Sequence, residues 1–221
     1  GETISFSNAI KALAIKSAND VATAVAEHIS GSEKQFALKM TEKARELGMY
    51  STTFKNASGL HDNYQTTTAY DMAILGLRMI KDYPEESKVF SIKEFSYEGK
   101  KYSSHNRLLY TYNGAKGIKT GFTSMSGFNL LTYVTRSNKQ LISVVMGGST
   151  SNSRNSNMAK VLDLSLKKTG GNIPYPIMNP YSVSDLKNQK IDYSLNHKQS
   201  ISSSKYDILS NRVNKFLAIL P

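Results

Sequence analysis

The sequence predicts an α+β fold in which helices pack against an antiparallel sheet. Several segments with helical periodicity lie within residues 5–83. β-Type segments joined by short turns follow between residues 94 and 148. One further helical segment, residues 155–168, closes the pattern. Because helices and strands are grouped along the chain and do not alternate, the strands are expected to pair antiparallel and to be backed by the helices.

The first two predicted helices flank an interruption. Residues 5–15 place apolar side chains at helical spacing, the sequence KSAND at 16–20 breaks this pattern, and residues 20–29 resume it with Asp20 near the start. A carboxylate in the first turn is favourable because it faces the positive end of the helix dipole. The break is therefore expected to separate two helices.

Two further helices have recognisable ends. Residues 32–47 form an amphipathic pattern that begins at Ser32, a favoured N-cap, and stops at Gly48, which tolerates the left-handed conformation that ends many helices. A polar loop follows. Residues 66–83 then form a helix with threonines in front and Pro84 behind, where a further turn cannot form.

The strands are predicted from β-branched and aromatic residues that lie between turn signals. Residues 94–103 predict a hairpin around Glu98-Gly99, and residues 117–123 form a short β-like segment. Residues 128–148, rich in Leu, Val, Ile, Thr and Tyr, predict two long strands joined at Ser137-Asn138.

The composition is that of a globular domain followed by a polar segment. Hydrophobic residues make up 39% of the 221 residues and charged residues 20%, and no apolar run reaches the roughly 18–20 residues of a membrane-spanning helix. Four of the five prolines lie beyond Gly170, together with many Ser and Asn. We therefore expect one domain over 1–170 and a tail over 171–221 without a core of its own. The apolar residues 213–220 are expected to dock as a short helix or to contact a membrane.

The net charge of +11 and the absence of cysteine restrict the function classes. The lysines are scattered and form no basic block, so a solvated lysine-rich surface is favoured over nucleic-acid binding. Without cysteine there is no disulfide, thiolate nucleophile or cysteine-bound metal, and His28 and His61 form no metal-ligand pattern with acidic residues. The chain starts with Gly and shows no export signal, so its natural N-terminus is expected further upstream.

The triplet Lys-Thr-Gly occurs twice, in different contexts. Residues 168–170 end the last predicted helix, where glycine is a common stop, so a structural role is favoured there. Residues 119–121 follow Gly117 in a β-like segment, and glycine at the rim of a strand lets a substrate backbone approach closely. In this copy Lys119 offers a cation for a carboxylate and Thr120 a hydroxyl donor. The first copy is the candidate site.

Ser17 and Asn19 stand at the break between the first two helices. A Ser-x-Asn turn at a helix break can direct a hydroxyl and an amide into the same cleft. The alternative is that one of them caps the helix beginning at Asp20, and from these residues alone the cap is favoured.

Ser-x-Asn followed by Lys-Thr-Gly is a motif pair of penicillin-binding proteins and serine β-lactamases. With the surrounding stretches, residues 2–168 closely resemble the low-molecular-mass D-alanyl-D-alanine carboxypeptidases; these stretches include IKSANDVATAVAEHISG, TTFKNASGLHD, TTTAYDMAILG and HNRLLYTYNGAKGIKTGFT. The resemblance implies a DD-peptidase/β-lactamase-like fold. It also implies a serine-type carboxypeptidase domain at 1–170 that trims the terminal D-alanine from peptidoglycan stem peptides. Class A β-lactamases share this fold, but the long matches favour the carboxypeptidases.

The resemblance also implies roles for matching residues. Ser17 would relay a proton to the leaving amine, Asn19 would hold the substrate amide and position the catalytic lysine, and Lys119 would tune Ser17.

Substrate binding is assigned by the resemblance to one strand and one arginine. Lys119 and Thr120 would bind the terminal carboxylate, and the backbone near Phe122 would donate to the oxyanion. The full set is Lys119, Thr120, Gly121, Phe122 and Arg154. For Arg154 a surface position is the alternative, and for His105 a satisfied structural role is favoured over a catalytic one.

The acylated serine of this family belongs to a Ser-x-x-Lys motif that precedes Ser-x-Asn by many tens of residues. The sixteen residues before Ser17 contain no such motif, since Ser7 and Lys11 are four apart. Three later matches follow the first Lys-Thr-Gly in the wrong order and are attributed to composition: Ser165/Lys168, Ser184/Lys187 and Ser202/Lys205. The interpretation is an N-terminally incomplete chain without its nucleophile, which is expected to expose apolar surface and to form no acyl-enzyme alone.

Three functions are open at this stage. The first is part of a D-Ala-D-Ala carboxypeptidase that needs no metal or cofactor. It would act on the cell wall in the periplasm or another extracytoplasmic space, with or without membrane contact, and would bind β-lactams when complete. The second is an inactive pseudoenzyme that binds peptidoglycan peptides or a partner. The third is a basic protein that binds an anionic polymer.

Overall fold

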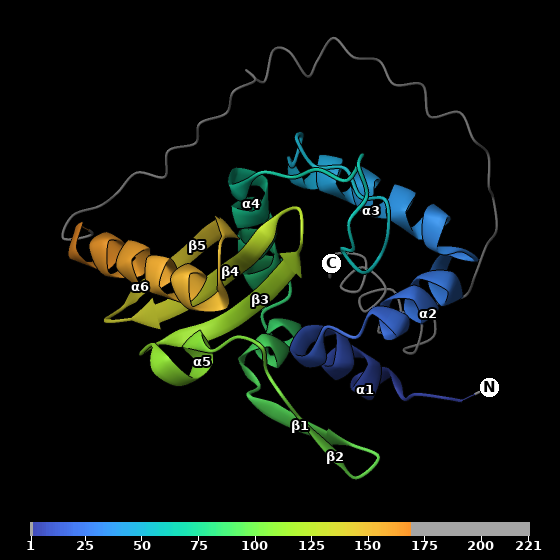
Figure 1. The fold of residues 1–221 in the computed structure, drawn as a ribbon, viewed down its shortest axis with the longest axis horizontal. Coiled ribbons are helices and arrows are strands. Elements are labelled where there is room, and N and C mark those ends of the chain that lie inside the picture. The colour runs from blue at the N-terminus through green and yellow to red at the C-terminus, as the bar shows by residue number, and fades with distance from the viewer. Residues whose placement is uncertain (1, 169–221) are drawn as a thin grey trace.

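The computed structural model describes residues 2–168 and has the predicted α+β fold. A helical layer lies beside an antiparallel sheet, and one further helix covers the other face of the sheet (Figure 1). In chain order the elements are α1 (Phe6–Lys11), the π-helix η1 (Ala12–Lys16), α2 (Asn19–Ser30), α3 (Glu33–Leu47), α4 (Ala69–Asp82), the 3₁₀ helix η2 (Glu86–Ser91), β1 (Glu94–Tyr97), β2 (Lys100–Ser103), α5 (Leu108–Thr111), β3 (Ala115–Thr123), β4 (Gly127–Arg136), β5 (Lys139–Gly148) and α6 (Ser151–Lys168). The expected tail at 171–221 lies outside the described residues.

Two helices begin and end where the capping residues predict. Ser32 Oγ accepts a hydrogen bond from Gln35 N at 3.2 Å at the start of α3, and Gly48 ends this helix with a φ of 89°. Thr68 Oγ1 accepts from Asp71 N at 3.1 Å at the start of α4. These side chains bind backbone N–H groups that have no partner within the helix.

The break between the first two helices is sharper than the apolar pattern indicates. α1 continues into the π-helix over Ala12–Lys16, and the chain then turns at Ser17, which has left-handed φ and ψ of 57° and 50°. A π-turn is wider than an α-turn and is found mostly as a local irregularity, often at a functional site. Ser17 therefore lies, with Ala18, in the short link between two helices.

The main sheet has three antiparallel strands in the order β3-β4-β5. Lys119 of β3 pairs with Leu131 of β4, which pairs in turn with Val144 of β5. β1 and β2 form a separate two-stranded hairpin beside α1 (Figure 1).

Both predicted hairpin turns are confirmed. Ser137 and Asn138, between β4 and β5, have φ values of 50° and 60°, and Glu98 and Gly99, between β1 and β2, have 49° and 73°. Two consecutive residues with positive φ form the tight turn whose twist matches that of the flanking strands.

Several boundaries and elements differ from the expectation. β3 begins at Ala115 and α6 at Ser151, both earlier than expected, so that Arg154 lies on a helix. η2 and α5 were not expected, because one or two turns contain too few residues to show a periodicity. Within residues 2–168, none of the helices combines the length and the apolar character needed to cross a bilayer.

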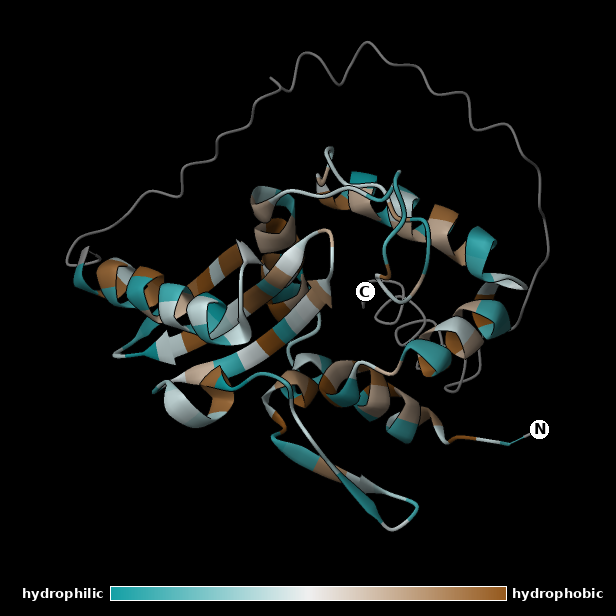
Figure 2. Ribbon diagram, in the orientation of Figure 1, coloured by the Kyte–Doolittle hydropathy of each residue, from teal (hydrophilic) through white to brown (hydrophobic). Residues whose placement is uncertain are grey.

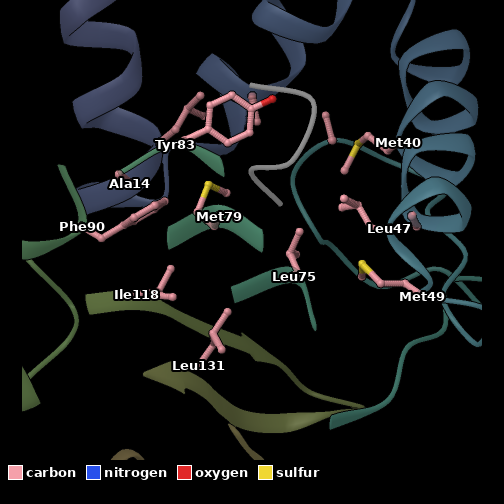
Figure 3. Close-up of a cluster of buried hydrophobic side chains, with 14 of the residues drawn as sticks. Ala14, Met40, Leu47, Met49, Leu75, Met79, Tyr83, Phe90, Ile118 and Leu131 are labelled. Carbon is pink, nitrogen blue, oxygen red and sulfur yellow. The ribbon is translucent and has the colours of Figure 1, made fainter. Parts of the chain in front are cut away.

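The sheet has an apolar cluster on each face. Leu131 points toward the helical layer, whereas Leu130 and Val134 point toward α6, as the alternation of side chains along a strand requires. On the first face the cluster extends through Leu75 and Met79 of α4 to side chains of α3 (Figure 3). Figure 2 shows apolar and polar residues alternating around the helices, as expected for helices with one buried side.

Gly76 allows α4 to approach the sheet closely. A Cβ at this position would lie 2.9 Å from Leu131 Cδ1, and 3.3 Å from both Ile118 Cδ1 and Ile142 Cγ2. These three side chains, one from each strand, fill the space that a larger residue would occupy. The separation of helix and sheet is therefore set by a residue without a side chain.

Candidate active site

Ser17 of the Ser-x-Asn motif contacts Lys119 of the first Lys-Thr-Gly triplet. Lys119 Nζ donates to Ser17 Oγ at 2.5 Å, although 102 residues separate them in the sequence. The same ammonium group donates to the Thr120 carbonyl at 2.8 Å. The contact joins the helical layer to the sheet at the point where η1 ends and α2 begins.

Ser17 is directed toward Lys119 by the backbone. The N-cap of α2 is Ala18, and no side chain makes a capping hydrogen bond there. The expectation that Ser17 or Asn19 caps this helix is therefore wrong, because the left-handed turn at Ser17 points its hydroxyl to Lys119 instead. Asn19 is the first residue of α2, exposed, and without a side-chain hydrogen bond to another described residue.

Burial of its ammonium group lowers the pKa of Lys119 from 10.5 to about 8. Burial disfavours the charged form because it removes hydration that two hydrogen bonds replace only in part. None of the ion pairs among residues 2–168 involves this lysine. Near neutral pH both the charged and the neutral form of Lys119 are therefore populated, so its side chain can give up and take back a proton.

The rest of the first Lys-Thr-Gly segment forms an open rim. Thr120 is half-buried, while Gly121 and Phe122 are exposed. The Phe122 ring packs on that of Phe128 with 4.3 Å between centroids. The nearest atom to a Cβ built at Gly121 would be 3.9 Å away, so there is room for the backbone of an extended peptide along this strand.

Arg154, on α6, is buried with only 3% of its surface exposed, so the surface alternative is wrong. Its guanidinium group donates to Asn155 Oδ1 at 2.9 and 3.1 Å and to the Asn129 carbonyl at 3.3 Å. Burial lowers the pKa of Arg154. Asn129 pairs with Gly121 in the sheet, so this buried cation lies one strand away from the rim. Sequence reasoning did not single out Asn129, whose only signal is its place two residues after the Gly127 turn.

His105 is exposed and lies near three positively charged side chains, those of Lys16, Lys119 and Arg154. Loss of hydration lowers the pKa of its ring, and the positive charges of Lys16, Lys119 and Arg154 lower it further. The ring makes no hydrogen bond to another described residue, so the expectation of a satisfied structural histidine is wrong. Sequence reasoning also missed Lys16, although it stands directly before Ser17.

The other candidate motifs are not brought to Ser17 and Lys119 in the part of the chain that the structure describes. Lys168 is the last residue of α6, and Thr169 and Gly170 lie outside the described residues. Ser165 donates to the Val161 carbonyl at 2.8 Å, an ordinary bond for a serine within a helix. The matches at 184–187 and 202–205 also lie outside the described residues. Across residues 2–168, no three His, Asp or Glu side chains are arranged to hold a metal ion.

Comparison with known sequences identifies relatives. A family model described as D-alanyl-D-alanine carboxypeptidase (Peptidase_S11) matches residues 1–150. D-alanyl-D-alanine carboxypeptidase DacF of Bacillus subtilis is 37% identical over 172 residues, which cover 76% of this chain and 44% of that protein. DacA of Haemophilus influenzae is 40% identical over 162 residues, covering 72% of this chain and 41% of that protein. The chain therefore spans less than half the length of these curated relatives.

Solved structures share the fold. Penicillin-binding protein 5 from Haemophilus influenzae matches with a TM-score of 0.73 and 37% identity, over 76% of this chain and 49% of that one. Penicillin-binding protein D2 from Listeria monocytogenes, in its ampicillin-bound form, matches with a TM-score of 0.69 and 30% identity, over 75% of this chain and 69% of that one. Nearly a third of the Listeria structure thus has no counterpart in the match.

Proposed function

Because the chain belongs to the D-alanyl-D-alanine carboxypeptidase family, we propose that it provides the substrate-binding and proton-relay side of a serine-type D-Ala-D-Ala carboxypeptidase site. The observation that carries this proposal is the hydrogen bond between Lys119 Nζ and Ser17 Oγ. The substrate is a peptidoglycan stem peptide, and the bond cleaved is the peptide bond between its two terminal D-alanines.

The attacking serine, in this proposal, belongs to a Ser-x-x-Lys motif in polypeptide outside the 221 residues. Its hydroxyl adds to the scissile carbonyl, the C–N bond breaks to release D-alanine, and water then hydrolyses the acyl-enzyme. The lysine of the Ser-x-x-Lys motif takes the hydroxyl proton of the attacking serine. Ser17 passes a proton to the leaving amine, Lys119 returns one to Ser17, and exchange with solvent carries a proton from the first lysine back to Lys119. The pKa of Lys119, lowered to about 8, makes both of its protonation states accessible near neutral pH. Asn19 is assigned to the substrate amide.

Substrate binding is assigned to the rim of β3 and to Arg154. Lys119 and Thr120 bind the terminal carboxylate, Arg154 adds a buried positive charge, and Gly121 lets the peptide approach the strand. The Phe122 N–H donates to the oxyanion that forms during attack. Buried cations that form no ion pair within residues 2–168 favour an anionic ligand, because a charge-assisted hydrogen bond offsets the hydration they have lost.

This reaction is placed outside the cytoplasmic membrane, in the periplasm or another extracytoplasmic space, because its substrate is part of the cell wall. Peripheral membrane contact is part of the proposal. β-Lactams are expected to acylate the completed site, in keeping with the ampicillin-bound form of the Listeria structure.

Covalent labelling with a fluorescent penicillin tests the assignment. The 221-residue chain is expected to give no adduct by intact mass, and a version extended upstream through an in-frame Ser-x-x-Lys should give one adduct per molecule. In the extended version, Lys119→Ala should slow labelling by about a hundredfold. Lys116→Ala, at an exposed lysine of the same strand, should leave the rate unchanged. A stoichiometric adduct on the 221-residue chain would mean that one of its own serines is activated, against this assignment.

A second candidate is a binding protein without catalysis. It is favoured by the ammonium group of Lys119 and the buried guanidinium group of Arg154, which offer positive charge to a carboxylate without the help of an attacking serine. Such a protein would hold D-Ala-D-Ala peptides, or a protein partner, through Lys119 and Arg154. Saturable NMR shifts at both residues on addition of a D-Ala-D-Ala peptide, with no penicillin adduct in the extended version, would support it; an adduct would refute it.

A further inference from the structure

The positive charge of the domain is concentrated in the half that contains the main sheet. Residues 99–168, which form β2, α5, β3–β5 and α6, contain eleven Lys and Arg and a single acidic residue, Asp163. Residues 1–98, which form β1 and the other helices, contain eleven Lys and Arg and thirteen Asp and Glu. The basic residues form no block in the sequence, but the fold gathers them around one sheet. A surface with this imbalance attracts anionic groups.

A cavity of about 240 Å³ opens in this half, between the β4–β5 turn and the C-terminal end of α6. The turn and this end of α6 lie at the same end of the sheet (Figure 1). Lys119 pairs with Leu131, five residues before Arg136 along β4, so about 17 Å of strand separates the cavity from the candidate active site. The residues around the cavity are Arg136, Ser137, Lys139, Asp163, Leu166 and Lys167.

Three of these side chains are cations, and one of the three caps α6. Lys139 Nζ donates to the Leu166 carbonyl at 3.0 Å, so its ammonium group binds a carbonyl in the last turn of this helix. Arg136 and Lys167 are exposed, and none of the ion pairs among residues 2–168 involves either of them. Two cations therefore remain at the cavity beyond the one that caps the helix.

The charges around the cavity leave a positive excess. The carboxylate of Asp163 accepts a hydrogen bond from the Tyr112 hydroxyl at 2.7 Å and offsets one of the three positive charges. The C-terminal end of α6 adds about half a negative charge, so the excess is about one and a half positive charges. A phosphate diester carries a single negative charge and a monoester about −1.5 to −2. A phosphate group therefore matches this excess, and the planar guanidinium group of Arg136 can bind two of its oxygens.

The C-terminal segment of the same chain is a poor occupant because of its charge. Residues 169–221 begin directly after α6, and they contain six Lys and Arg and three Asp and Glu. A segment with a net positive charge is repelled from a site whose own excess is positive. The ligand is therefore expected to come from another molecule.

We propose that this cavity binds a phosphate group, as carried by a phosphodiester polymer or by a lipid headgroup. Arg136, Lys139 and Lys167 supply the positive charge, and Ser137 supplies a hydroxyl donor. Because most of the surrounding side chains are exposed, the cavity can receive a group presented on a polymer or on a membrane surface. The phosphate site does not depend on the proposed function, since it shares no residue with the candidate active site. Its occupation would hold the domain against an anionic surface and leave the candidate active site free.

Titration of the 221-residue chain with a short poly(glycerol phosphate), followed by NMR, tests the site. Saturable shifts are expected for the backbone amides of residues 136–139 and 166–167, which border the cavity. Sedimentation with vesicles of phosphatidylcholine and phosphatidylglycerol tests the lipid source, and vesicles of pure phosphatidylcholine serve as the blank. Both measurements are made at physiological salt, where distant charges are screened.

Two double variants with the same net charge separate a site from general charge attraction. Arg136→Gln with Lys167→Gln should weaken binding at least about tenfold, because each substitution removes a charge-assisted hydrogen bond at the cavity. Lys100→Gln with Lys160→Gln should weaken it less than about twofold. Lys100 lies on the separate β1–β2 hairpin (Figure 1), and Lys160 lies about 10 Å along α6 from Lys167, beyond the screening length of about 8 Å. All four side chains are exposed, so both double variants are expected to fold.

The outcomes are distinct. A loss confined to the first double variant supports the site. Binding of the polymer alone then identifies a polymer phosphate as the ligand, binding of the mixed vesicles alone a lipid headgroup, and binding of both the phosphodiester itself. Equal losses in the two double variants would overturn the proposal, because general charge and not this cavity would then hold the ligand. Absence of saturable binding to both probes, or shifts that lie away from the cavity, would also overturn it.

Discussion

Replacing Lys119 by methionine should stabilise the folded chain at neutral pH while removing its candidate function. Burial lowers the pKa of Lys119 from 10.5 to about 8, and one pH unit corresponds to about 1.4 kcal/mol, so keeping this ammonium group charged in the fold costs about 3 kcal/mol. Methionine has a similar length and needs no hydration. Loss of the hydrogen bonds to Ser17 and Thr120 removes about 1–2 kcal/mol. The net expected gain is about 1–2 kcal/mol at pH 7.

The pH dependence of stability gives a more specific signature. Since the pKa of Lys119 is lower in the folded chain, the unfolded chain binds more protons between about pH 8 and 10.5. The free energy of unfolding therefore rises with pH in this window. The cost of the buried charge is fully present below about pH 8 and is relieved by about pH 10.5. Relative to Lys119→Met, the unmodified chain should gain about 3 kcal/mol across the window.

Urea unfolding followed by circular dichroism measures these differences. The unmodified chain, Lys119→Met and the control Lys116→Met, an exposed lysine of the same strand, would be compared at pH 7 and pH 10. Subtraction of the Lys119→Met curve cancels the titration of the other lysines and tyrosines. The reasoning fails if the two methionine variants are equally stable at pH 7 and the difference between Lys119→Met and the unmodified chain does not change with pH.

Asp71→Asn should lower the free energy of unfolding by about 1–3 kcal/mol, because the buried carboxylate accepts hydrogen bonds from a backbone N–H and a hydroxyl of the preceding loop. Asp62→Asn, in a polar loop, should change it by less than about 0.5 kcal/mol in the same urea titration. Gly114→Ala should cost about 2 kcal/mol more than Gly99→Ala, because both have positive φ but only the former would bring a Cβ against the backbone of β4; equal costs would count against this contact. A D-Ala-D-Ala peptide should bind about tenfold more weakly at pH 9 than at pH 7, by NMR titration, as Lys119 loses its charge; unchanged affinity would exclude this lysine as the carboxylate ligand.

Elements determined by neighbouring residues could be predicted from the sequence. Ser32 and Gly48 mark the ends of α3 because capping depends on the local backbone and one side chain. The Ser137-Asn138 turn is likewise local, since two small polar residues between β-type segments suit positive φ. The grouping of helices before strands then predicts an antiparallel sheet.

The candidate site depends on contacts that the local sequence does not contain. The contact of Ser17 with Lys119 spans 102 residues, and only the family resemblance paired the two motifs. The π-helix before Ser17 shows the same apolar spacing as an α-helix over so short a stretch, so the left-handed turn had no signal. Arg154 is buried because it lies in the first turn of α6 and packs against Gly148, where a side chain would leave no room for it. The start of α6 at Ser151 is four residues earlier than the sequence pattern predicts.

Gly76 links the evolution of α4 to that of a site it does not touch. The side chains beneath it are those of Ile118, which precedes Lys119, and Leu131, which pairs with Lys119 across the sheet. A mutation that adds even a methyl group to α4 here must displace these side chains by some tenths of an ångström. Substitutions at position 76 of α4 are therefore limited by the need to keep Lys119 of the neighbouring sheet in its position. Homologues in which position 76 has changed are expected to carry compensating, smaller residues at positions 118 or 131.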